Sequence, residues 1–212
     1  MKKTTKKTKS RIVSAAWKLF YEQGYDATTI EEIVEESHTS RGSFYHYFEG
    51  KDALLGSLSY MFDEKYEELE DELAQRGEGS VETLAFLNHE LFEMIETSID
   101  FELLCRLLAS QLTTSGEKHL LDRNRTYYRL LRKIVREGQQ RGEITRRFSV
   151  NELVKHYALC ERGMMYDWCL SRAEYSLTEY ADTFMPGFLK TFRAEEREEG
   201  PRAERPGAAS KL

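Results

Sequence analysis

Apolar residues recur every three or four positions along most of this 212-residue chain, which is the spacing typical of amphipathic α-helices. No stretch shows the sustained alternation of polar and apolar residues that indicates a β-strand, and the chain contains only three prolines. The pattern therefore predicts an all-α protein of about nine helices.

The first 54 residues predict three short helices and the start of a fourth. The first helix carries five apolar residues on one face, which are Ile12, Ala15, Ala16, Leu19 and Phe20. Gly24 is placed to end this helix, and Thr29 with Glu32 forms a capping box for a second one. Ser40 caps a third helix, which runs to Phe48. A helix, a tight turn and a helix form a helix-turn-helix unit, whose second helix enters the major groove of DNA.

The remainder of the chain predicts a larger helical bundle. A longer helix begins at Asp52, and five further helices are expected over 80–98, 101–112, 117–141, 150–172 and 177–193. The segment 101–112 is apolar nearly all round, so we expect it to be central. Pro186 lies inside the last helix and is expected to kink or break it near Met185.

These elements divide the chain into three parts. We expect a DNA-binding head with a basic N-terminal arm over residues 1–51 and a ligand-binding and dimerisation domain over 52–193. Residues 194–212 lack apolar anchors and are expected to be disordered.

Charge is distributed unevenly between these parts. The chain has a net charge of −6, yet residues 1–20 carry seven basic side chains and no acidic one. Residues 56–212 carry 22 basic and 29 acidic side chains, a net charge of −7. Because the acidic part repels DNA, the distribution favours DNA contact at one end of the molecule only.

The third helix carries Arg41, Ser43, Tyr45 and His46 on one polar face, which suits insertion into a DNA groove. Around it, residues 11–55 resemble the tetracycline-repressor (TetR) family. The matching elements are Ala15-Ala16 with Leu19-Phe20, Gly24, Thr29-Ile30 with Ile33-Val34, Ser40 through Phe48, and the step Phe48-Glu49-Gly50-Lys51 into Leu54. The resemblance covers about a fifth of the chain.

The resemblance implies that double-stranded operator DNA is contacted by nine residues, which are Thr29, Glu31, Ser40, Arg41, Gly42, Ser43, Tyr45, His46 and Lys51. Their chemistry indicates distinct roles. Lys51 lies at a helix N-terminus, where a phosphate is favoured, and Tyr45 can donate to a phosphate. Arg41 can reach guanine O6 and N7 bidentately.

Two positions depart from the family pattern. His38 occupies the tight turn where the family usually has glycine, so we expect a positive φ there. Glu31 places an acid where phosphates approach. It either accepts from cytosine N4 or turns away to solvent, and we favour the second.

Polar side chains interrupt the apolar faces of four helices in the larger domain: Asn88, Gln111, Asn124 and Glu161. They either converge on a ligand cavity, bond one another, pair across a dimer interface, or lie at the edge of the apolar face in water. We interpret them as part of a ligand site. The candidate ligand-binding residues are Asn88, Phe92, Gln111, Asn124, Tyr128, Tyr157, Glu161, Met165 and Trp168.

The resemblance further implies a homodimer formed through helices 150–172 and 177–193. We interpret the chain as a ligand-responsive transcriptional repressor, which binds a pseudo-palindromic operator as a dimer and is released by a small-molecule inducer. The alternative is a ligand-independent architectural or cell-division factor that uses the same head. A cavity lined by the four polar residues would favour the repressor, and a filled core would favour the alternative.

The sequence contains no motif typical of an enzyme, a metal site or a membrane span. The sequence holds no nucleophile elbow or glycine-rich phosphate loop, so we expect no enzymatic activity and no cofactor. The pairs His89 with Glu93 and His156 with Cys160 lack the remaining ligands of a metal site. No apolar run has the roughly 18–20 residues that a membrane span needs. Three cysteines without metal spacing suggest buried, reduced thiols and a cytoplasmic location.

Overall fold

The computed structural model describes residues 2–113 and 118–195, with the backbone alone for 2–6, 58, 60, 61, 71, 74 and 75. Most of the tail predicted for 194–212 lies outside these residues. The described part of the chain is all-α apart from one isolated bridge between Ile144 and Arg193. Its elements are α1 (Lys2–Gln23), α2 (Ile30–Glu36), α3 (Arg41–Tyr47), α4 (Asp52–Leu55), α5 (Leu58–Arg76), α6 (Ser80–Ser98), α7 (Phe101–Thr113), the 3-10 helix η1 (His119–Leu121), α8 (Thr126–Arg141), α9 (Val150–Leu170), α10 (Leu177–Leu189) and the 3-10 helix η2 (Lys190–Phe192).

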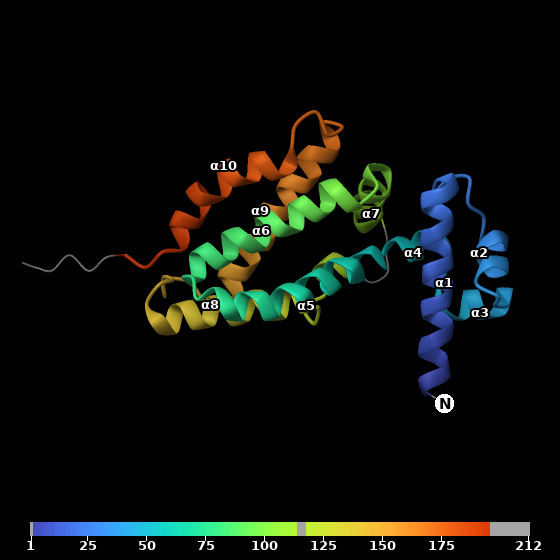
Figure 1. Cartoon of the computed structure of the whole chain (residues 1–212), viewed down its shortest axis with the longest axis horizontal. Coiled ribbons are helices and arrows are strands. Elements are labelled where there is room, and N and C mark those ends of the chain that lie inside the picture. The colour runs from blue at the N-terminus through green and yellow to red at the C-terminus, as the bar shows by residue number, and fades with distance from the viewer. Residues whose placement is uncertain (1, 114–117, 196–212) are drawn as a thin grey trace, which may run out of the picture.

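Helices α1, α2 and α3 form a separate unit at one end of the molecule, which we call the head (Figure 1). Its centre is closed by fully buried apolar side chains, among them Ile12, Ile33 and Phe44. Thr29 and Glu32 form the predicted capping box of α2, and the Ser40 hydroxyl accepts from the backbone amide of Ser43 at the start of α3.

The tight turn between α2 and α3 has the backbone predicted for it. His38 adopts φ +48°, in the left-handed region. The guanidinium of Arg11 donates from Nη2 to the carbonyl of Ser37 at 2.5 Å and to that of His38 at 2.7 Å, so α1 holds the turn in place.

Helices α5, α6, α8, α9 and α10 pack into the larger bundle, which we call the core (Figure 1). Helix α6 lies along α10 and also contacts α5 and α8, and α9 packs on α8. Among its buried apolar residues are Leu84, Phe92 and Val135. Helix α7 packs between α4 and α9, and its Leu112 is exposed, so the prediction that this segment is central was wrong.

The helix predicted to run on from Asp52 is divided into α4 and α5 at Gly56 and Ser57, which gives ten α-helices in the described chain rather than nine. The Ser57 hydroxyl donates to the Leu54 carbonyl at 2.5 Å and accepts from Trp17 Nε1 at 2.7 Å. The imidazole of His119 lies against Gly56, where a Cβ atom would collide with it. We call this break, where α1 and η1 both contact the chain, the junction.

Three other expectations are corrected. The helix predicted over 117–141 begins only at Thr126, after η1 and a short loop. Helix α10 continues through Pro186 to Leu189, so the expected break near Met185 is absent. The three cysteines are free thiols that are half-buried rather than buried. Within the described residues, no helix combines the length and apolar character that crossing a membrane requires.

Candidate DNA-binding and ligand-binding sites

Helix α3 presents the polar side chains that the sequence assigned to DNA. Tyr45 is 47% exposed, and His46 is exposed beside it, while Phe44 and Phe48 pack inward. Ser40 and Ser43 share a hydrogen bond of 2.9 Å at the start of the helix. The exposed face of α3 therefore offers a phenol, an imidazole and hydroxyls in one place.

Glu31 is solvent-exposed and forms an ion pair that the sequence did not predict. Its carboxylate pairs with Nη1 of Arg41 at 3.0 Å, and both side chains are well exposed. The guanidinium of Arg41 also lies 5.8 Å from the centre of the Tyr45 ring. Glu31 thus orients Arg41 across the turn between α2 and α3, at the edge of the exposed face.

Lys51 lies at the N-terminus of α4, as expected, and its ammonium has partners within the head. Its ammonium donates to the carbonyls of Tyr25 at 2.6 Å and Thr28 at 2.8 Å, and it lies 4.4 Å from the centre of the Tyr25 ring. The side chain therefore ties α4 to the loop between α1 and α2. It precedes α4, which has only four residues.

The head contacts the core at two further places. The Tyr21 hydroxyl donates to the Ser98 carbonyl at 3.1 Å, at the end of α6. The guanidinium of Arg106 on α7 pairs with Asp26 and lies 5.0 Å from the centre of the Tyr25 ring. With Trp17 at the junction, these contacts link the position of the head to that of α4, α6 and α7.

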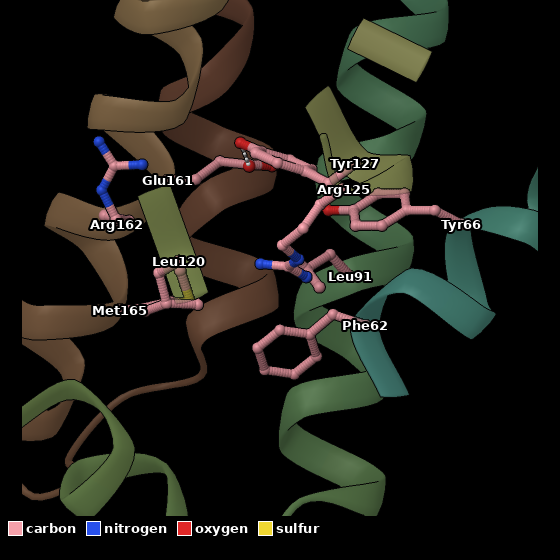
Figure 2. Close-up of a pocket in the computed structure, with 9 residues that line it drawn as sticks. All are labelled: Phe62, Tyr66, Leu91, Leu120, Arg125, Tyr127, Glu161, Arg162 and Met165. Atoms are coloured by element: carbon pink, nitrogen blue, oxygen red, sulfur yellow. Dashed lines mark hydrogen bonds between the residues drawn. The ribbon is translucent and has the colours of Figure 1, made fainter. Parts of the chain in front are cut away.

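The core contains a small, partly open cavity of about 30 Å³ (Figure 2). Helices α5, α6, α8 and α9, together with η1 and the loop before α8, contribute its lining. The lining residues are Phe62, Tyr66, Leu91, Leu120, Arg125, Tyr127, Glu161, Arg162 and Met165. A space of this size holds a water molecule or one small polar group.

Glu161 is a buried carboxylate with assigned partners. It accepts from Asn88 Nδ2 at 3.0 Å and from the Tyr127 hydroxyl at 2.6 Å. Burial raises the pKa of Glu161, and the hydrogen bonds from Tyr127 and Asn88 oppose that rise. Asn88 and Glu161 thus bond one another, which was one of the alternatives to a ligand role.

The other polar lining residues are also engaged. Arg125 donates from Nε to Asp63 at 3.0 Å and from Nη2 to the Ser59 carbonyl at 2.6 Å. Arg162 donates from Nη1 to the Tyr128 hydroxyl at 3.1 Å. Each guanidinium has five N–H donors, so these bonds leave donors on both arginines.

The predicted ligand residues are not all gathered at this cavity. Glu161 and Met165 line it, and Asn88 and Tyr128 each bond a lining residue. Phe92 is buried outside the lining, and Gln111 accepts from the Leu120 amide at 3.3 Å. The Tyr157 hydroxyl lies beside the Glu161 carboxylate and donates to the Leu84 carbonyl at 2.8 Å. Two others lie away from the cavity lining, namely Asn124, exposed in the loop before α8, and Trp168, whose indole donates to the Tyr175 carbonyl.

Seven of the nine lining residues were not among the predicted ligand residues, and Tyr66 is the one among them whose polar group has no partner in the described part of the chain. Its side chain is 2% exposed, and its hydroxyl has no hydrogen-bond partner among the described residues. Figure 2 shows the hydroxyl pointing inward from α5 towards the other lining residues. A tyrosine in an apolar helix face has the same pattern as any core aromatic residue, so no sequence signal distinguished it.

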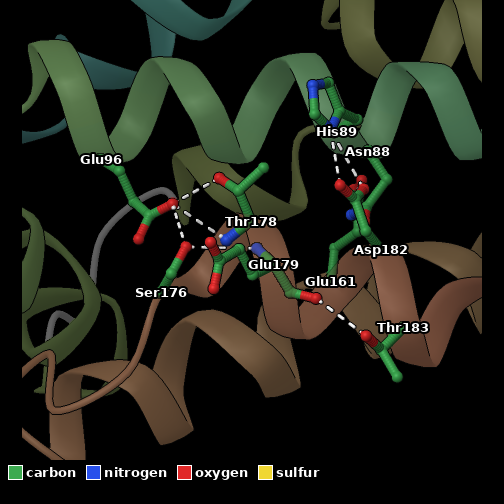
Figure 3. A network of polar contacts seen from close by, with 9 residues as sticks. All are labelled: Asn88, His89, Glu96, Glu161, Ser176, Thr178, Glu179, Asp182 and Thr183. Atoms are coloured by element: carbon green, nitrogen blue, oxygen red, sulfur yellow. Dashed lines mark hydrogen bonds and ion pairs between the residues drawn. The ribbon is translucent and has the colours of Figure 1, made fainter.

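Polar contacts also connect α6 with α10 (Figure 3). The Glu96 carboxylate accepts from the backbone amides of Leu177 at 2.7 Å and Thr178 at 3.0 Å, which caps α10. His89, Glu90 and Glu93 place potential metal ligands within 4.8 Å of one another. Two of them have other partners, since Glu90 pairs with Lys65 at 2.7 Å and His89 with Asp182 at 3.0 Å.

Known proteins resemble this chain in two respects, the sequence of the head and the overall fold. Residues 12–58 match the family model described as bacterial regulatory proteins, tetR family. Over 62 residues the chain is 42% identical to YuxN of Bacillus subtilis, an uncharacterised HTH-type transcriptional regulator. That stretch spans 29% of this chain and about a fifth, 21%, of YuxN.

Two longer matches extend beyond the head. The HTH-type transcriptional regulator HbdR of Aromatoleum sp. (strain CIB) is 28% identical over 189 residues, which cover 85% of this chain and 78% of HbdR. FadR of Thermus thermophilus, a TetR-family transcriptional repressor solved with lauroyl-CoA, superposes with a TM-score of 0.74 and 25% identity. The superposition covers 94% of this chain and 99% of that one. The head of this chain therefore belongs to the tetR family of bacterial regulatory proteins, and the chain as a whole shares the fold of a TetR-family repressor.

Proposed function

We propose that this protein is a ligand-responsive transcriptional regulator, and more narrowly a repressor that leaves its operator when a small molecule binds the core. The observation that carries the proposal is the exposed polar face of α3, on a head whose residues match the family model. The similarity to a repressor solved with an acyl-CoA ligand supports a ligand-binding role for the core.

The nine residues expected at the DNA divide into two groups in this proposal. Arg41 and His46 approach base edges and Tyr45 donates to a phosphate, because all three side chains are exposed on the α3 face. Thr29 and Ser40 cap α2 and α3 with their side chains, Ser43 shares a hydrogen bond with Ser40, and all three approach phosphates. Gly42 is exposed and lets the α3 backbone approach the groove, Glu31 orients Arg41, and Lys51 fixes the geometry of the head.

We further assign the dimer interface to α9 and α10. Four large apolar side chains are exposed there: Leu159, Leu170, Tyr180 and Phe184. The rings of Tyr180, Phe184 and Phe188 stack along α10, with centres 6.1 and 6.5 Å apart. Exposed apolar side chains on both helices, with a row of aromatic rings along α10, support pairing with a second copy.

The junction is in contact with both the head and the short helix η1 beside the cavity. Leu120 of η1 lines the cavity, and its neighbour His119 lies against Gly56. Arg125 lines the cavity too, and it holds the Ser59 carbonyl at the start of α5. A ligand that displaces η1 or Arg125 therefore shifts the junction, where Trp17 of the head is bonded to Ser57. Such a shift changes the spacing between the two heads of a dimer.

The test selects DNA sites with the purified full chain and then screens small molecules for release of the selected DNA. We expect a pseudo-palindromic site and at least one compound that lowers the affinity for it. Failure to enrich any sequence would overturn the DNA-binding proposal. Enrichment of many unrelated sites, with no compound that releases them, would support the architectural alternative instead.

A further inference from the structure

We propose that Tyr66, with the guanidinium groups of Arg125 and Arg162, is the polar anchor of the core cavity. The cavity then takes the carboxylate or carbonyl end of an otherwise apolar ligand. This inference rests on the proposed ligand-responsive function, and it names the chemical class of the ligand.

The first observation is the Tyr66 hydroxyl. It belongs to a side chain that is 2% exposed, it lines the cavity, and no described residue accepts or donates a hydrogen bond to it. A buried hydroxyl without a partner destabilises the folded chain, so its retention needs an explanation. A ligand oxygen that accepts from Tyr66 supplies the missing partner.

The second observation is a set of unused donors around the cavity. Arg125 uses two of its nitrogens on Asp63 and Ser59, and Arg162 uses one on Tyr128. Glu161 is the carboxylate of the lining, and its two oxygens already accept from Asn88 and Tyr127. Unused N–H donors on both arginines and the Tyr66 hydroxyl therefore face the cavity together, and an oxygen acceptor complements them.

The same charges disfavour a cationic ligand. Two guanidinium groups line the space, and Glu161 is a poor counter-ion because burial raises its pKa. The remaining lining is apolar, with Phe62, Leu91 and other aliphatic side chains, which suits a hydrocarbon body.

The size of the cavity decides how such a ligand enters. A volume of about 30 Å³ accommodates a carboxylate but no hydrocarbon chain. The hydrocarbon body of the ligand therefore extends out of the partly open cavity along its apolar lining, which includes Leu120. Leu120 belongs to the short helix η1, next to the His119 that contacts Gly56. Entry of the ligand thus acts on the junction.

The test uses three probes of equal chain length that differ in the head group: octanoate, octan-1-ol and octylammonium. Binding to the full chain is measured by isothermal titration calorimetry for the wild type, Tyr66→Phe and the control Tyr175→Phe. Tyr66→Phe removes a hydroxyl without a described partner, so the variant should fold. The control removes a tyrosine hydroxyl outside the cavity lining, one that bonds Asp167.

We expect octanoate to bind the wild type and the control alike, and Tyr66→Phe about ten-fold more weakly, because a hydrogen bond to a charged group is lost. Octanol should bind more weakly than octanoate, and octylammonium should not bind. Equal octanoate affinity in wild type and Tyr66→Phe, preferred binding of octylammonium, or no octanoate binding would each overturn the inference.

Measurement of DNA affinity on the same samples separates this inference from the proposed function. Sequence-specific DNA binding without octanoate binding would overturn the ligand class and leave the DNA-binding role intact. Octanoate binding that depends on Tyr66 but does not release DNA would support the anchor and contradict the ligand-responsive role.

Discussion

In the head, Tyr45 is 47% exposed on α3, and His46 is exposed beside it; in the core, the Glu161 carboxylate is 1% exposed and holds two hydrogen bonds. Exposed polar groups are hydrogen-bonded by water and cost the fold little free energy, whereas buried polar groups need a partner within the protein. The head is therefore ready to bind a macromolecule as it stands. The core has satisfied its carboxylate internally and leaves only Tyr66 without a partner among the described residues.

This difference separates two kinds of functional residue. We propose that those of the head act directly by touching DNA, so their removal should not disturb the fold. Those of the core act through the geometry of the cavity and the junction, so their removal changes stability as well as binding. Substitutions in the head and in the core should therefore differ in their effects on stability.

The largest effect is expected at the apolar surface of the core. Phe184→Glu places a charge on the exposed face of α10, which should abolish dimerisation and reduce operator affinity to that of one head. Sedimentation velocity measures the change, and Phe184→Leu is the matched control that keeps the surface apolar. An unchanged dimer in Phe184→Glu would place the interface elsewhere.

A smaller loss is expected at the recognition helix. Tyr45→Ala and His46→Ala should each weaken specific operator binding by roughly 1–3 kcal/mol while thermal stability and dimerisation are unchanged. Tyr45→Phe keeps the ring and loses only the hydroxyl, so its operator affinity should lie between those of the wild type and Tyr45→Ala. Fluorescence anisotropy with labelled operator provides the measurement, and wild-type affinity in both alanine variants would contradict the role of α3.

A substitution at the junction should lower the stability of the fold by disturbing its packing. Gly56→Ala introduces a Cβ that meets the His119 ring, so we expect a destabilisation of about 1–3 kcal/mol in urea unfolding. Gly50→Ala is the control, because its Cβ would have no neighbour within 4 Å. In the double variant, His119→Ala should recover part of the loss. Additive losses would mean that His119 does not press on Gly56.

The smallest effect is a pH dependence of stability. Because burial raises the pKa of Glu161 above 4.5, the folded state binds more protons than the unfolded state above that pH. The wild type should lose stability relative to Glu161→Gln as the pH rises from 4.5 through the raised pKa, by at most about 1.4 kcal/mol per pH unit.

The control for this dependence is Glu152→Gln. Hydrogen bonds from Ser149 lower the pKa of the exposed Glu152, so its contribution is present above pH 4.5 and is lost as the pH falls. The two variants should therefore differ from the wild type in opposite directions. Thermal melts between pH 4 and 8 measure both, and parallel curves would contradict the assignment for Glu161.

The sequence predicted the head in detail because local rules determine it. Capping residues fix the starts of α2 and α3, and the spacing of Phe44 and Phe48 fixes which face of α3 is exposed. The helix expected over 80–98 coincides with α6 for the same reason. DNA contacts themselves remain predictions.

The core was less predictable because its polar pairs form over long sequence separations. Asn88 and Glu161 are 73 residues apart, and periodicity shows only that both face inward. Asn124 was expected on a helix face, but α8 begins two residues later and leaves it exposed. Tyr66 carries no sequence signal, since its significance lies in the absence of a nearby partner.

The most direct test of the account is the spacing of half-sites in the selected operator. Two heads on one dimer should read half-sites about one helical turn of DNA apart, near 34–36 Å, or a multiple of it. Insertion of about five base pairs between the half-sites turns them to opposite faces of the duplex and should reduce affinity to that of a single half-site. A selected site without two-fold symmetry, or affinity unchanged by the insertion, would contradict the account.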